Sequence, residues 1–179
     1  MCTCKWLSPF ILATAVLFFT EMTLAGPNLG RDVTPEEIAV WDMSIPPDGS
    51  GLPAGGGTAV EGAAVYKAHC AACHGANGTG GPADPLVGGI GTLASKKPVK
   101  TVGSYWPYAT TLFDYIRRAM PYMAPGSLSA DDIYAVSAYI LAEGKIIDKS
   151  TVLDAESLPK VAMPNRDGFI PDPRPELFK

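Results

Sequence analysis

Apolar positions at helical spacing predict three main helices in the central part of the chain. The first begins at Thr58, which forms a capping-box pattern with Glu61, and its apolar positions continue into Cys70. The second runs from Leu112 to about Ala119, where one face is apolar. Thr110 or Thr111 is the expected cap of this second helix, and Pro121 is expected to stop it.

A third helix is predicted from Ser129 to Glu143. Ser129 and Asp132 resemble a helix start, and Gly144 is the expected C-cap. Its apolar stripe consists of Ile133, Val136 and Ile140, and such stripes usually face a core. The residues around these helices therefore indicate a mostly helical domain.

The N-terminal part contains one further helix signal. Thr34 and Glu37 have the spacing of a capping box, which predicts a short helix that ends near Asp42. Trp41 and Ile45 are the expected anchors of this arm on the domain. Residues 46–51 and 55–57 are rich in glycine and proline and are expected to form a loop.

The first residues have the pattern of a secretory signal. A lysine precedes a mostly apolar run over residues 6–19, and Thr23-Leu24-Ala25 is a small-residue cleavage site. An uncleaved membrane anchor is the alternative, but the run is short for a full span and Pro9 interrupts it. We therefore expect cleavage near Ala25 and a periplasmic protein.

The charge balance excludes one class of partner. The chain has 14 basic and 18 acidic residues and a formal net charge of −4. No basic stripe is present, so nucleic acid is not an expected partner. A mildly acidic carrier would suit a partner with a positive docking patch.

The candidate chemistry lies at the end of the first main helix. Cys70 and Cys73 are separated by two residues and His74 follows at once, which is the spacing of c-type haem attachment sites. On one helical turn, both thiols can bond to the vinyl groups of one porphyrin while the histidine binds the iron. The motif predicts one covalent haem c, with Cys70 and Cys73 as attachment points and His74 as axial ligand.

Other interpretations of this motif fit less well. A redox dithiol would need a thioredoxin-like βαβ context, which the pattern lacks. A zinc site needs four ligands, and the remaining cysteines, Cys2 and Cys4, fall in the expected signal peptide. A disulfide within the motif would leave its histidine unexplained. His69 is expected to be a solvated helix residue.

The segment after the motif, residues 75–91, is a long irregular loop rich in glycine and proline. Such loops are unusual inside compact domains, but a haem can replace the missing core. The side chains expected to form a wall against the porphyrin are Leu86, Val87, Ile90 and Leu93.

The second axial ligand is expected from the loop before the last helix. Met120 is favoured because Pro121 follows it and residues 125–129, Pro-Gly-Ser-Leu-Ser, come next. Met123 lies in the same loop and is the alternative. A methionine opposite a histidine raises the reduction potential relative to two histidines. Tyr105, Trp106 and Arg117 are candidates for contacts with haem propionates.

These motifs resemble those of class I cytochromes c, including the Met-Pro-x-x-x-Pro-Gly-Ser-Leu-Ser ligand loop. More narrowly, the chain resembles the monohaem domain of the cytochrome subunit of Sox-type sulfur dehydrogenases and related sulfite dehydrogenases. The matching segments are residues 41–42, 47–53, 98–108 and 117–121. The Sox-type subunit commonly carries a second haem domain, whereas this chain has a single CxxCH motif.

The resemblance implies an all-α class I cytochrome c fold wrapped around one covalent haem. Its expected organisation is a signal peptide at 1–25, an N-terminal arm at 26–57, the cytochrome c domain at 58–144 and a proline-rich extension at 145–179. It implies a single-electron carrier without catalytic residues or a small-molecule substrate of its own.

The implied partners are a periplasmic dehydrogenase with a molybdenum-cofactor subunit, acting on sulfite or another sulfur compound, and a downstream cytochrome or oxidase. Two alternatives remain open: a haem enzyme acting at the iron, and an electron acceptor of another periplasmic dehydrogenase. A haem enzyme would need acid–base groups beside an open iron position, and the chain offers no distal histidine except His69.

Overall fold

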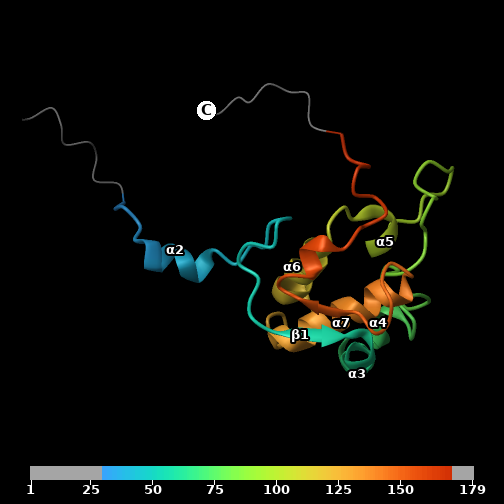
Figure 1. Ribbon diagram of the computed structural model, residues 1–179, viewed down its shortest axis with the longest axis horizontal. Coiled ribbons are helices and arrows are strands. Elements are labelled where there is room, and N and C mark those ends of the chain that lie inside the picture. The colour runs from blue at the N-terminus through green and yellow to red at the C-terminus, as the bar shows by residue number, and fades with distance from the viewer. Residues whose placement is uncertain (1–29, 171–179) are drawn as a thin grey trace, which may run out of the picture. The chain divides into compact units, whose positions relative to one another are not determined.

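The computed structural model of the chain describes residues 30–170 (Figure 1). The predicted signal peptide, residues 1–25, lies outside these residues. No helix within 30–170 is long and apolar enough to cross a membrane. The chain divides into two compact units, Met1–Asp42 and Met43–Lys179, and residues 43–57 of the predicted arm fall in the second unit.

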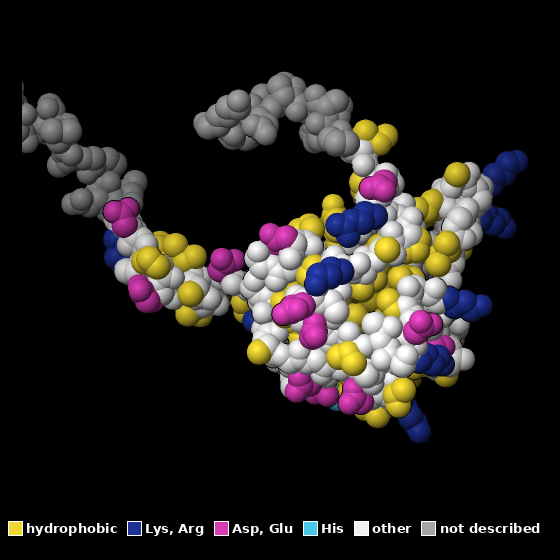
Figure 2. Space-filling model, viewed as in Figure 1, with side chains coloured by type: hydrophobic (Ala, Val, Ile, Leu, Met, Phe, Trp, Pro, Cys, Tyr) yellow, Lys and Arg dark blue, Asp and Glu magenta, His cyan; other side chains and the backbone are white. Residues whose placement is uncertain are grey.

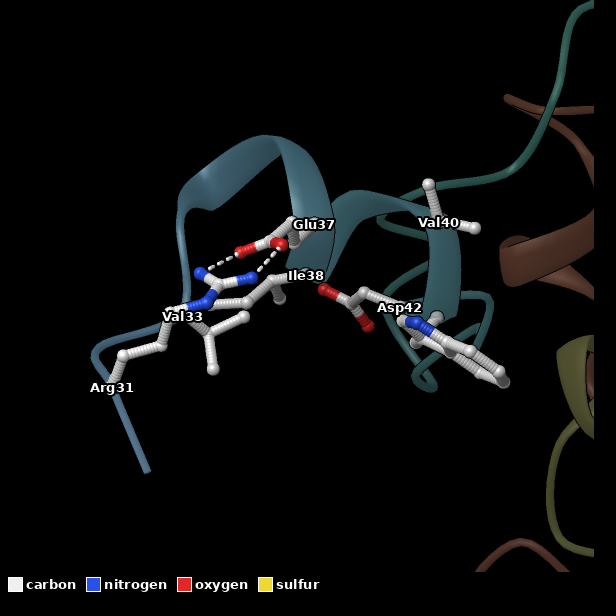
Figure 3. Close-up of a pocket in the computed structure, with 7 residues that line it drawn as sticks. Arg31, Val33, Glu37, Ile38, Val40 and Asp42 are labelled. Atoms are coloured by element: carbon white, nitrogen blue, oxygen red, sulfur yellow. Dashed lines mark hydrogen bonds and ion pairs between the residues drawn. The ribbon is translucent and has the colours of Figure 1, made fainter. Parts of the chain in front are cut away.

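The described part of the first unit contains the short helix α2, Pro35–Trp41, as predicted. Figure 2 shows hydrophobic side chains gathered over this segment, with acidic side chains at its margins. Thr34 and Glu37 form a capping box, and Arg31 makes an ion pair with Glu37 (Figure 3). The helix has no buried residue. The role of Trp41 as an anchor of the arm stays a prediction.

The second unit contains the three main helices, α3 (Ala59–His69), α6 (Ala109–Ala119) and α7 (Ala130–Glu143). The predicted capping boxes of α3 and α7 are confirmed. The start of α6 differs from the prediction: Tyr108 is the N-cap, and the helix begins one turn earlier because Ala109 and Thr110 are already buried against the core.

Several shorter elements were not predicted. These are α4 (Ala71–His74), α5 (Val102–Tyr105), and an antiparallel ladder of β1 (Gly56–Thr58) with β2 (Val152–Asp154). The expectation of a loop at residues 55–57 is therefore wrong for Gly56 and Gly57. Their pairing partners lie far along the chain, and glycine carries little strand signal of its own.

Helix α7 lies at the centre of the second unit and packs against α3, α6, β1 and β2 (Figure 1). Tyr66 of α3 lies against Tyr139 of α7, with ring centroids 4.8 Å apart. Phe113 of α6 lies against Tyr134 of α7 at 4.5 Å. These aromatic pairs join the three helices into one core.

The segment before β1 is also fastened to this core. Ile45 is buried, as expected of an anchor, and its N–H donates to Asp114 Oδ1 at 3.1 Å. Asp114 also pairs with Arg118 on the same helix. The Tyr134 hydroxyl donates to the Pro53 carbonyl at 2.9 Å. Residues 43–53 are thus held to α6 and α7 by polar contacts as well as by burial.

The C-terminal extension packs into the core. Leu153 of β2 and Leu158 of the 3₁₀ helix η1, Leu158–Lys160, are fully buried, and Val161 and Met163 are nearly so. Leu158→Ala is expected to lower the free energy of unfolding by about 3 kcal/mol, because it leaves a cavity in a packed core. Denaturant unfolding of the mature holoprotein measures this, and Val152→Ala, at a position 54% exposed, is the control with an expected loss below about 1 kcal/mol.

Gly144 is the C-cap of α7, as predicted, but the left-handed backbone position lies one residue further on. Gly144 has right-handed backbone angles, and the residue with positive φ is Lys145, at 60°. The Lys145 N–H donates to the Ala142 carbonyl and the Ile146 N–H donates to the Leu141 carbonyl, both at 2.9 Å. This is a Schellman motif whose left-handed position holds a lysine.

Lys145→Gly is therefore expected to raise the free energy of unfolding by about 0.5–1 kcal/mol, since glycine adopts positive φ without steric cost. The same change at exposed Lys67 in α3 should lower it by about 1 kcal/mol. Denaturant unfolding of both variants measures whether the free energy of unfolding rises or falls. A loss of stability at position 145 would contradict this assignment of the cap.

Candidate functional site

The predicted attachment residues lie where α3 leads into α4: Cys70 is the junction, and Cys73 and His74 are in α4. Cys70 ends α3, where its N–H donates to the Tyr66 carbonyl at 2.9 Å. Its own carbonyl accepts hydrogen bonds from the N–H groups of Cys73, at 3.1 Å, and His74, at 3.0 Å. The structure thus brings all three residues of the motif together on a single helical turn.

The turn is closed by Gly75. This residue has φ of +83°, and a Cβ there would lie 1.8 Å from the Thr79 carbonyl oxygen. The Gly75 carbonyl accepts a hydrogen bond of 2.9 Å from the hydroxyl of Tyr66. Burial raises the pKa of Tyr66 to about 12, so the hydroxyl remains a donor at neutral pH.

The imidazole of His74 is oriented by the backbone of the following loop. His74 Nδ1 lies 2.8 Å from the Asp84 carbonyl oxygen. A carbonyl can only accept, so Nδ1 carries the proton and Nε2 keeps its lone pair. This is the arrangement in which a histidine binds a metal through Nε2, with its ring held in place from the other side.

The two thiols do not have the character of a redox pair. Both are free; Cys70 is half-buried and Cys73 is exposed. Burial raises the pKa of the Cys70 thiol to about 11, with a smaller contribution from Cys73. Dithiol oxidoreductases instead lower a cysteine pKa to obtain a thiolate. Within residues 30–170, no three histidine, cysteine or carboxylate side chains gather as a metal cluster, which leaves a zinc site without enough ligands.

The loop that follows the motif lacks a core of its own. Between residues 75 and 100, Gly78 is the only buried residue. Of the expected wall, Leu86, Val87 and Leu93 are half-buried and Ile90 is exposed.

This loop is fixed by hydrogen bonds, for example from the Leu86 N–H to the Gly78 carbonyl at 2.8 Å and from Thr101 Oγ1 to the Gly88 carbonyl at 2.6 Å. Apolar side chains on an ordered loop without a core fit a large apolar ring that packs against them. With two thiols and an imidazole beside the loop, the donor set fits haem c.

The two candidate methionines differ in burial. Met120 is the C-cap of α6, and its half-buried side chain packs against the core cluster. The Met120–Pro121 peptide bond is cis. Met123 is 89% exposed. The geometry favours Met120 as the internal ligand, because a thioether that is almost fully in solvent would have to move inward to reach an iron.

The C-terminal extension covers the segment between α5 and α6. Asn165 Nδ2 donates to the Tyr105 carbonyl at 2.6 Å, and the Phe169 ring meets the Tyr105 ring edge-on at 5.3 Å. The Arg166 guanidinium lies 5.1 Å from the centre of the Tyr108 ring. Residues 165–169 therefore hold in place the segment that contains Tyr105 and Trp106, two residues predicted to contact haem propionates.

The residues expected near haem propionates have separate surroundings. Trp106 is half-buried, and its ring meets that of Tyr115 edge-on at 5.6 Å. Arg117 lines a groove with Met43, Pro53 and other residues. Their contact with propionates stays a prediction.

Several positions that shape the site were not singled out from the sequence. Asp84 and Gly75 act through their backbone carbonyls, and because every residue type has one, the sequence does not single out these positions. Tyr66 and Asn165 act through side chains whose partners cannot be known before the fold is. One signal was available for Asp84, since Pro85 follows it and restricts its backbone to extended conformations.

Comparison with known proteins adds to this geometry. The family model described as Cytochrome c matches residues 59–143. No curated protein matches the chain. Among solved structures, the chain is similar to one in the crystal structure of the sulfane dehydrogenase SoxCD from Paracoccus pantotrophus. They share 42% sequence identity with a TM-score of 0.76, over 83% of this chain and 74% of that one.

The expected class I cytochrome c fold is thereby confirmed. A relative that is 42% identical over about three quarters of its length shares more than a fold. The chain therefore belongs to the cytochrome c family of electron-transfer proteins, in which haem c is covalently bound.

Proposed function

We propose that this cytochrome is a periplasmic carrier of single electrons that accepts them from a molybdenum-dependent dehydrogenase of sulfite or another sulfur compound. The observation that carries the proposal is the 42% identity with a chain of a sulfane dehydrogenase. The resemblance of residues 98–108 and 117–121 to Sox-type cytochrome subunits supports it. The apolar run and small-residue cleavage site near Ala25 support export.

The proposed site holds one haem c, which supplies a reversible one-electron iron couple when bound. Cys70 and Cys73 anchor it covalently, and the Asp84 carbonyl holds the His74 ring so that Nε2 is presented as a ligand. Met120 would supply a soft thioether as the second iron ligand, which would favour the reduced state and raise the potential. Leu86, Val87 and Leu93 of the following loop would pack against the porphyrin.

The chain offers little for chemistry at the iron itself. The histidine outside the motif, His69, is exposed at the end of α3. A haem enzyme would need an open iron position with an acid–base group beside it. A half-buried methionine at the core and an exposed second histidine favour a carrier.

Stopped-flow mixing tests the proposed donor. Oxidised cytochrome is mixed with a periplasmic molybdenum sulfur-compound dehydrogenase, with and without sulfite or thiosulfate. The expected result is haem reduction that requires both enzyme and substrate. The opposing result is no reduction with any sulfur substrate, together with rapid reduction by an alcohol or sugar dehydrogenase.

A further inference from the structure

The loop that orients His74 is attached to the helical core by a buried tyrosine. Tyr66 of α3 is 1% exposed, and its hydroxyl donates to the Gly75 carbonyl at 2.9 Å. Gly75 directly follows His74, so this bond acts one residue away from the expected iron ligand. Helix α3 itself packs against α7, the central helix of this unit (Figure 1). The Tyr66 hydroxyl therefore connects the start of the loop to the core.

The ring of Tyr66 is held in place by α7. The Tyr139 ring packs against it, with centroids 4.8 Å apart and an angle of 35° between the planes. The Tyr139 hydroxyl lies 3.4 Å from the Ala76 carbonyl oxygen, which is long for a hydrogen bond between two oxygens. Tyr66 thus makes the short contact to the loop, and Tyr139 fixes the position of the Tyr66 ring.

Hydrogen bonds connect Gly75 to the far end of the loop. The Gly75 carbonyl also accepts from the Gly78 N–H at 3.3 Å, and the Gly78 carbonyl accepts from the Leu86 N–H at 2.8 Å. Gly78 is buried and has φ of +79°. A Cβ there would lie 2.6 Å from Val87 Cγ2, so glycine allows the two segments to approach each other. The two ends of the loop therefore meet at Gly78.

Asp84 lies between two fixed positions of this loop. On one side, the Ala83 N–H donates to the Cys73 carbonyl at 2.9 Å. On the other side, Leu86 is bound to Gly78. The position of the Asp84 carbonyl therefore depends on both of these attachments, and the second one leads back to the tyrosine of α3.

The Asp84 carbonyl acts on the electronic character of the expected iron ligand. It lies 2.8 Å from His74 Nδ1, and a hydrogen bond at that nitrogen raises the basicity of the nitrogen that binds the metal. A more basic ligand stabilises ferric over ferrous iron, because the ferric ion carries the greater positive charge. A weaker or more mobile hydrogen bond would therefore raise the reduction potential.

We propose that the Tyr66 hydroxyl is a positioning group for the haem ligand: it holds the loop of residues 75–87 so that the Asp84 carbonyl stays on His74 and limits the reduction potential. Tyr66 does not touch the reacting atoms and acts through the backbone of the loop. This inference rests on the part of the proposed function that places haem c at this site, and it adds a residue by which the chain adjusts the potential.

The test compares two buried tyrosines in the mature holoprotein. Tyr66→Phe removes the hydroxyl and keeps the ring. Tyr134→Phe is the matched control, because Tyr134 is 0% exposed, its hydroxyl donates to the Pro53 carbonyl at 2.9 Å, and its ring packs against Phe113. Each variant loses one buried hydrogen bond, so both should unfold at a lower denaturant concentration than the wild type, by similar amounts. Covalently bound haem is expected in each.

Two readouts separate positioning from stability. At the midpoint potential of the wild type, the ratio of reduced to oxidised haem in Tyr66→Phe should rise at least about twofold. In the reduced protein, the Nδ1 proton of His74, followed by nuclear magnetic resonance, should exchange with solvent at least about threefold faster. Both quantities should stay at their wild-type values in Tyr134→Phe.

A wild-type ratio and a wild-type exchange rate in Tyr66→Phe, with only its stability lowered, would leave Tyr66 a purely structural role and overturn the inference. Equal changes in both variants would also overturn it, because they would report a general loosening of the core. Neither result touches the proposed function, which would instead be overturned by a wild type that has no one-electron haem couple.

Discussion

Gly62→Val is expected to remove at least about 3 kcal/mol from the free energy of unfolding, because the two central helices could no longer meet. A Cβ at Gly62 of α3 would lie 1.9 Å from the carbonyl oxygen of Ala135 in α7 and 2.9 Å from the Cβ of Tyr139. The first of these neighbours is backbone, so a rotamer change cannot relieve the clash. Gly57 of β1 also lies close to Ala135: a Cβ at Gly57 would be 2.6 Å from the Cβ of Ala135.

Guanidinium unfolding of the holoprotein, followed by circular dichroism, measures the loss. Ala63→Val is the matched control, because Ala63 is the next residue of α3 and is exposed. Its expected cost is about 0.5 kcal/mol, from helix propensity alone. Equal stabilities of the two variants would contradict the close approach of α3 and α7 at Gly62.

Met120→Leu is expected to lower the reduction potential by on the order of 100 mV, because the soft thioether that favours the reduced iron is lost. The same variant should lose the weak near-infrared band by which ferric haem reports a methionine ligand. Met120 is half-buried against the core, so leucine fills its volume and the fold should be retained. Redox titration and near-infrared absorption of the ferric protein measure both effects.

Met123→Leu is the control for that experiment. Its side chain is 89% exposed, so the band and the potential should stay at wild-type values. The reverse pattern, with the band lost in Met123→Leu and kept in Met120→Leu, would assign the ligand to Met123.

The parts of the fold that could be predicted are those with local signals. Thr34, Thr58 and Ser129 each begin a helix through a capping box formed within four residues, so three starts were correct. The ladder of β1 with β2 and the burial of Leu158 depend on contacts between distant segments. A glycine-rich strand and a proline-rich tail have weak patterns, and their structure comes from the core they join.

The residues of the candidate site also divide into those with a local sequence signal and those whose role depends on the fold. The Cys70–His74 motif and the Met120 loop could be found because the chemistry requires particular side chains at particular spacings. The Asp84 carbonyl that orients His74 could not, since any residue supplies a carbonyl.

One measurement addresses the central proposal, that a single haem c on Cys70 and Cys73 makes this chain a one-electron carrier. The full chain is expressed with periplasmic export and haem maturation factors, and its haem content, resistance to acid–acetone extraction and redox titration are determined on one sample. The expected result is one haem per chain that stays on the polypeptide and a single one-electron Nernst curve. Haem that is extracted into the solvent, or a purified protein that holds none, would contradict it.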